Sequence, residues 1–129
     1  MKRILIVAVA ALLCISAGAQ TQNTNQGQVM EQVGEDYKIV SDETIDGIRY
    51  IVATPSAKVC SKQIDIQIKG KVIQSVVYTR GCDGNAKGIG ALIKGMKVDE
   101  AIRRLEGINC GKRGTSCPDQ LAKVLKSLK

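Results

Sequence analysis

The sequence contains no histidine, tryptophan or phenylalanine, and three tyrosines are its only aromatic residues. The absence of histidine removes the usual imidazole base and the imidazole metal ligand. Any chemistry of this chain must therefore come from thiols, carboxylates and lysines. Five cysteines are present. Four of them lie in the body of the chain and are its most informative residues.

The shortage of aromatic residues also bears on nucleic-acid binding. The chain carries a net charge of +7 at neutral pH, but its lysines are scattered among acidic residues. A nucleic-acid surface needs clustered cations and preferably stacking aromatic side chains. We therefore interpret the positive charge as a solvated surface and expect no nucleic-acid partner.

The longest apolar run, residues 4–15, lies at the start of the chain and is too short to span a bilayer comfortably. Basic residues precede it, and the small residues 17–19 follow it. This order is typical of a secretory signal peptide, with an uncleaved membrane anchor as the alternative. We expect residues 1–19, including Cys14, to be removed on export to the periplasm or cell envelope, which leaves no stable membrane span.

Residues 20–40 form a polar segment that is rich in glutamine and asparagine. A segment with few apolar side chains cannot bury enough surface to offset its chain entropy, so we expect a flexible leader here. The remaining residues, 41–129, are expected to fold as one domain.

Three strands are predicted at the start of this domain. Residues 47–54 and 72–79 are rich in β-branched side chains, and residues 63–69 alternate strictly between isoleucine and polar residues. Gly70 and Lys71 form a two-residue connection with glycine first, which suits a type II′ hairpin turn. The simplest arrangement is an antiparallel meander with one buried face.

Apolar residues then recur with helical spacing, and Gly95 and Gly107 stand where the first two helices should stop. The three sets are Ile89, Leu92, Ile93 and Met96; Val98, Ala101, Ile102 and Leu105; and Leu121, Val124, Leu125 and Leu128. The fold class is therefore α+β, a three-stranded antiparallel meander followed by three short helices that cover one face of the sheet.

The four cysteines of the folded part all lie on predicted loops or at the ends of predicted elements. The hairpin centred on residues 70–71 places Cys60 roughly opposite Cys82. Cys110 follows the second helix, and Cys117 opens the third. Functional groups often lie on loops that a rigid scaffold holds in place.

The step from Cys117 to Pro118 marks the predicted start of the last helix. Proline favours the first helical position, and the residue before it avoids helical dihedral angles. We therefore predict Cys117 as the N-cap residue and Gln120 as the third residue of the helix. A sulfur there faces unpaired N–H groups and the positive end of the helix dipole, which favour a thiolate.

Three interpretations of the four sulfurs remain open on the residues alone. Four thiolates would suit a closed tetrahedral zinc site, although successive cysteines are separated by 21, 27 and 6 residues and form no C-x-x-C motif. Export and an even number of cysteines favour two disulfides, Cys60–Cys82 and Cys110–Cys117. Buried inert thiols are the third interpretation.

The string GTSCPD, residues 114–119, resembles the signature of the TSCPD domain family. Residues 59–62 (VCSK), 81–90 (GCDGNAKGIG) and 108–123 (INCGKRGTSCPDQLAK) are similar to the rest of that family's pattern, and the resemblance covers about residues 48–129. It implies zinc bound by the family's four cysteines, which are here Cys60, Cys82, Cys110 and Cys117.

TSCPD domains occur alone and at the C-terminus of adenosylcobalamin-dependent ribonucleoside-diphosphate reductases. The resemblance therefore implies an association with deoxyribonucleotide synthesis. The folded part is too short to enclose a nucleotide, a cobalamin and a radical cysteine by itself. Adenosylcobalamin is accordingly expected only in the larger reductases.

The order of elements is also similar to that of the iron–sulfur cluster scaffold proteins. In that comparison Cys60, Cys82 and Cys117 fall on the three cysteine positions of the scaffold, and Cys110 has no counterpart. The histidine that often precedes the last scaffold cysteine is Ser116 here, which weakens the case for cluster assembly.

The sequence thus favours a small exported TSCPD domain whose four cysteines bind zinc for a structural or partner-binding purpose, without naming the partner. The first alternative is a thiol–disulfide redox module that uses Cys110 and Cys117. The others are an accessory role with a reductase and an iron–sulfur scaffold.

Overall fold

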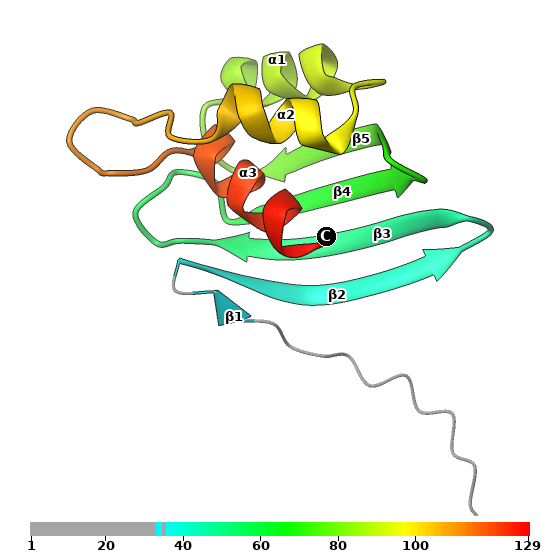
Figure 1. The fold of residues 1–129 in the computed structure, drawn as a ribbon. Coiled ribbons are helices and arrows are strands. Elements are labelled where there is room, and N and C mark those ends of the chain that lie inside the picture. Colours follow the sequence, from blue (N-terminus) through cyan, green and yellow to red (C-terminus); the bar gives the residue numbers. More distant parts are fainter. Residues whose placement is uncertain (1–32, 35) are drawn as a thin grey trace, which may run out of the picture.

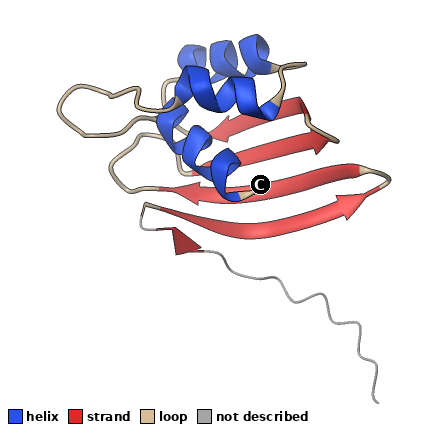
Figure 2. Cartoon of the chain, viewed as in Figure 1, coloured by secondary structure: helices blue, strands red, loops and turns tan. Residues whose placement is uncertain are grey.

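The computed structural model describes residues 33–34 and 36–129. The predicted signal peptide, residues 1–19, and most of the predicted leader, residues 20–40, lie outside the described residues. The described part is an α+β domain in which three helices lie on one face of an antiparallel sheet (Figures 1 and 2).

The sheet follows the order of the chain, β1-β2-β3-β4-β5, with every neighbouring pair antiparallel. Its strands are β1 (Val33–Gly34), β2 (Tyr37–Ile45), β3 (Ile48–Pro55), β4 (Gln63–Lys69) and β5 (Val72–Thr79). The helices that follow are α1 (Asp83–Ile93), α2 (Val98–Leu105) and α3 (Cys117–Ser127).

The predicted three-stranded meander was incomplete, because four long strands form the meander and the two-residue β1 extends it at the edge. The missing long strand is β2, and its residues 37–40 belong to the segment predicted as a flexible leader. Asp46 and Gly47 join β2 to β3 with positive φ angles of 51° and 76°. Two such angles in a two-residue loop match the type I′ hairpin turn, whose twist suits antiparallel strands.

The other three strands agree with the sequence pattern, and the pairing of β4 with β5 differs from a regular ladder only by a register shift between Gln67 and Ile68. In β4, Ile64, Ile66 and Ile68 are at most 5% exposed, whereas the alternate side chains of the strand are not buried. Ile66 pairs with Ile51 on one side and with Val76 on the other. This row forms the floor of the core, and each fully buried aliphatic side chain contributes about 1.5–3 kcal/mol.

The three predicted helices are confirmed, with one error in the first apolar stripe. Helix α3 contacts β2, β3 and α2, and α1 runs beside β5. Leu121 and Leu125 of α3 are fully buried. Leu92, which the helical spacing assigned to the buried stripe of α1, is 78% exposed, whereas Ile93 is 3% exposed. The reason is that α1 lies at the edge of the helical layer, so only a narrow face of it packs on the sheet.

The turns and loops that connect the elements lie in two groups, one at each end of the sheet. The turns 46–47 and 70–71 lie at one end of the sheet, and the loops 56–62, 80–82 and 106–116 gather at the other, where α3 begins (Figure 1). All four cysteines lie at this second end. Within residues 33–34 and 36–129, no helix is long and apolar enough to cross a membrane.

A four-cysteine pocket as the candidate functional site

All four cysteines of the folded part line one pocket of about 230 Å³. Cys60 lies in the loop after β3, Cys82 directly precedes α1, Cys110 lies in the loop between α2 and α3, and Cys117 is the first residue of α3. Cys60, Cys82 and Cys110 are exposed, Cys117 is partly buried, and all four are free thiols. Four separate segments therefore each contribute one cysteine to the lining of the same pocket.

The β4–β5 hairpin positions the first two cysteines. Gln63 pairs with Thr79, and the N–H of Lys62 donates to the carbonyl of Thr79 at 2.9 Å, so the ladder continues toward Cys60 and Cys82. Gly81 packs against the backbone of the facing segment, because a Cβ atom on it would lie 3.4 Å from the nitrogen of Ser61. The predicted opposition of the two cysteines is confirmed.

The predicted capping of the last helix was shifted by one residue. Ser116 is the N-cap, because its Oγ accepts a hydrogen bond from the N–H of Asp119 at 3.2 Å, and it also donates to the carbonyl of Ile108 at 2.6 Å. Cys117 is therefore the first helical residue, and Pro118 is the second. A proline fits there because the N–H groups of the first turn have no acceptor within the helix.

Two side chains donate hydrogen bonds to sulfur in this pocket. The hydroxyl of Ser61, which is 1% exposed, lies 3.2 Å from Cys117 Sγ, and Arg113 Nη1 lies 3.2 Å from Cys60 Sγ. The hydroxyl of Tyr78 donates to the carbonyl of Cys117 at 3.3 Å. Burial raises the pKa of Tyr78, and the nearby Cys117 raises it further, so this phenol stays a neutral donor.

A buried polar network lies beneath the start of α3. Thr115 Oγ1 donates to Asp119 Oδ2 at 2.6 Å and accepts from Gln120 Nε2 at 3.0 Å. Asp119 Oδ1 accepts from the N–H of Gly107 at 2.7 Å, and Gln120 Oε1 accepts from the N–H of Ser56 at 2.9 Å. Asp119 of the signature string thus ties the start of α3 to the end of α2, and the adjacent Gln120 ties it to the loop after β3. These bonds fix the position of Cys117.

Asp119 is charged in this network although it is only 4% exposed. Burial alone would raise its pKa, but the hydrogen bonds from Thr115 and Gly107 and the ammonium group of Lys123 together lower the pKa below its ordinary value. Lys123 Nζ lies 3.3 Å from Asp119 Oδ2 and 2.9 Å from Asp36 Oδ2. The segment before β2 is therefore joined to α3 as well.

Sequence reasoning missed Ser61, Arg113 and the Thr115–Asp119–Gln120 network. An aspartate in the first turn of a helix is common for dipole reasons alone, so nothing in the string distinguishes a buried Asp119 from a solvated one. The contacts of Ser61 and Arg113 with sulfur join residues more than fifty positions apart, and a single sequence carries no signal for such pairs.

The donor set of the pocket is the set that zinc prefers, since four thiolates form closed tetrahedral sites. Among residues 33–34 and 36–129, however, no three cysteine, aspartate or glutamate side chains already lie close enough together to hold a metal ion. The sulfurs would have to approach one another. Cys110 lies on an exposed loop, where its N–H donates to the carbonyl of Thr115 at 3.1 Å.

The fold and the site define an α+β domain in which one short signature string caps the last helix and contributes one cysteine to a four-cysteine pocket. The family model of the TSCPD domain matches residues 35–129. The chain belongs to the TSCPD domain family. No curated protein and no solved structure matches the chain, so the likeness to iron–sulfur scaffold proteins stays a prediction.

Proposed function

We propose that this TSCPD domain binds one zinc ion through Cys60, Cys82, Cys110 and Cys117. The observation that carries the proposal is that four thiols from four separate segments line a single pocket. Zinc would cross-link these segments and fix the surface around them. A site with four protein ligands has no open position for catalysis, so its purpose is structural or partner-binding.

The arrangement of the thiols supports one shared centre over two independent disulfides. Two disulfides would need only pairwise proximity, whereas all four cysteines here face the same 230 Å³ pocket. The surroundings of the sulfurs are also polar, with donors from Ser61 and Arg113.

The setting of the domain is part of the same proposal. The basic start, apolar run and small residues within 1–19 support export to the periplasm or cell envelope. The association of TSCPD domains with ribonucleoside-diphosphate reductases makes a reductase chain one candidate partner. An exported chain would instead meet a partner protein in the cell envelope. Co-purification from the cytoplasm and from the envelope distinguishes a reductase partner from an envelope partner.

The alternative is thiol–disulfide exchange by Cys110 and Cys117, which line the same pocket. The two thiols would pass two electrons and two protons to a disulfide of a partner protein and become a disulfide themselves. The position of Cys117 as the first residue of α3 supports this alternative, because it holds this thiol on a fixed helix end within the pocket.

Four single Cys→Ser variants at positions 60, 82, 110 and 117 separate the two functions. For a zinc site, elemental analysis should give about one zinc per chain, and each variant should lose it, because each removes one of four ligands. Chelation should lower the free energy of unfolding by about 4 kcal/mol if free zinc exceeds its dissociation constant a thousandfold. For exchange, only the variants at 110 and 117 should lose reduction of a test disulfide.

Ser61→Ala is the matched control. It removes the hydrogen bond to Cys117 Sγ but leaves all four thiols, so it should retain zinc. Wild-type protein that takes up no zinc, or Cys60→Ser and Cys82→Ser variants that bind it as well as wild type, would contradict the proposal.

A further inference from the structure

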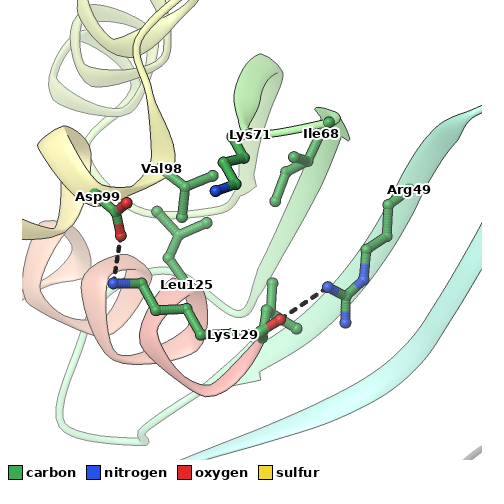
Figure 3. A pocket seen from close by; sticks show the side chains of 9 residues that line it. Arg49, Ile68, Lys71, Val98, Asp99, Leu125 and Lys129 are labelled. Carbon is green, nitrogen blue, oxygen red and sulfur yellow. Dashed lines mark hydrogen bonds and ion pairs between the residues drawn. The ribbon is translucent and has the colours of Figure 1, made fainter.

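A second cavity, of about 400 Å³, lies at the end of the sheet opposite the cysteines. Figure 3 shows it between the end of β4, the start of α2 and the end of α3. Its floor is apolar: Ile68 is 5% exposed, Leu125 is fully buried, and Val98 and Leu128 are partly buried. Small-molecule sites commonly have this size and an apolar lining with few polar groups.

The rim of this cavity carries three cationic side chains and one acidic side chain, and most of them already have partners. Arg49 is held by Asp42 at 2.7 Å and donates to the carbonyl of Leu128 at 2.9 Å. Lys129 pairs with Asp99. The charges of Arg49 and Lys129 are therefore already balanced, and an anionic ligand would have to displace Asp42 or Asp99 to pair with either cation.

Lys71 is the exception on the rim. It is exposed, and among residues 33–34 and 36–129 its ammonium group has no ion-pair or hydrogen-bond partner. Figure 3 shows its side chain turned toward Val98, above the apolar floor. Its backbone is fixed, because its carbonyl accepts a hydrogen bond from the N–H of Val98 at 2.9 Å. The cavity therefore presents a positive charge that is held in no direct ion pair, beside an apolar surface and within electrostatic reach of the Asp99 carboxylate.

We propose that this cavity binds a small amphipathic monoanion, namely a carboxylate with a short unbranched aliphatic chain. The carboxylate would pair with Lys71, and the chain would lie on Ile68, Val98 and Leu125. The positive end of the α2 dipole adds to the attraction. Asp99 opposes it, which limits the site to ligands with a single negative charge. This inference does not depend on the zinc proposal, because the two sites share no residue.

The test is a titration of ¹⁵N-labelled full chain with hexanoate, followed by amide chemical shifts. Saturable shifts should appear around residues 68, 71 and 98, with little change near the cysteines. Each methylene added between butanoate and hexanoate should tighten binding about threefold to fourfold, whereas hexylammonium should not bind. Absence of saturable shifts at millimolar hexanoate, or an affinity independent of chain length, would overturn the proposal.

Three variants test whether Lys71 recognises the carboxylate of the ligand. Lys71→Gln should weaken hexanoate binding about tenfold, because it removes a charged hydrogen-bond donor. Asp99→Asn should strengthen binding about threefold or more, because it removes the repelling carboxylate and frees Lys129. Lys69→Gln, which changes the net charge equally on an exposed side chain outside the cavity lining, should leave it unchanged. Equal weakening by Lys71→Gln and Lys69→Gln would show unspecific attraction and contradict the assignment.

Discussion

Asp119→Ala should lower the free energy of unfolding by about 3 kcal/mol, because it leaves one buried donor and one part-buried donor without their acceptor. Those donors are the N–H of Gly107 and the hydroxyl of Thr115, and the substitution also separates Lys123 from its buried partner. For a domain of this size the melting temperature should fall by roughly 12 to 24 °C. Thermal unfolding followed by circular dichroism measures both quantities.

Two further variants show whether the loss comes from the network. Asp119→Asn keeps the shape of the side chain but removes the charge, so its loss should be intermediate. Asp83→Ala removes an exposed carboxylate that pairs with Lys87 on α1, and it should change stability by no more than about 0.5 kcal/mol. If Asp119→Ala were as mild as Asp83→Ala, the signature string would not hold the fold together in the way inferred.

The same network sets the acid stability of the domain. The pKa of Asp119 is lower in the folded protein than its ordinary value of 3.8, and the pKa of Asp36 is lowered as well, chiefly by Lys123. The stability from these carboxylates is therefore fully present above about pH 4 and is lost as the pH falls through their lower folded values. In Asp119→Asn this acid-dependent loss should be smaller than in wild type.

Gly90→Ala should destabilise the domain, whereas Gly88→Ala, two residues earlier in the same helix, should not. A Cβ atom on Gly90 would lie 2.5 Å from the carbonyl oxygen of Val76, which is backbone and cannot turn aside. Overpacking of this kind costs about 1–3 kcal/mol, and alanine returns up to about 1 kcal/mol of helix propensity. We expect a net loss of about 1 kcal/mol in urea-induced unfolding.

Gly88 provides the matched control for this close approach. A Cβ atom there meets nothing within 4 Å, so Gly88→Ala should gain up to about 1 kcal/mol. Both positions lie in α1 and gain the same helix propensity from alanine. Stability changes of opposite sign would therefore show the effect of the steric contact at Gly90. A stabilising effect of Gly90→Ala equal to that of Gly88→Ala would mean that α1 does not pack so closely on β5.

The strands show which parts of the fold the sequence pattern could predict and which it could not. The strands 63–69 and 72–79 were predicted with the observed bounds, because strict alternation and a glycine-led turn are local signals. The strand β2 was missed because its exposed residues resemble a polar leader. The dipeptide Asp46-Gly47, a strong local signal for a hairpin, marked its end and could have revealed it.

The candidate site likewise has features that the sequence could predict and features that it could not. The hairpin register and the position of Cys117 at a helix start were enough to predict that the cysteines gather at one end of the domain. The shift of the cap to Ser116 was not predictable, because a proline is acceptable at either of the first two helical positions. The buried state of Asp119 and Gln120 depends on contacts with Gly107 and Ser56, which only the tertiary fold creates.

The shared zinc centre is tested most directly by counting reactive thiols while metal-free, reduced protein is titrated with zinc. Mass spectrometry after alkylation reports residues 60, 82, 110 and 117 individually. We expect one equivalent of zinc to protect all four thiols together, with no intermediate in which only two are protected. Protection of a single pair, or no protection at one equivalent, would contradict a four-thiolate site.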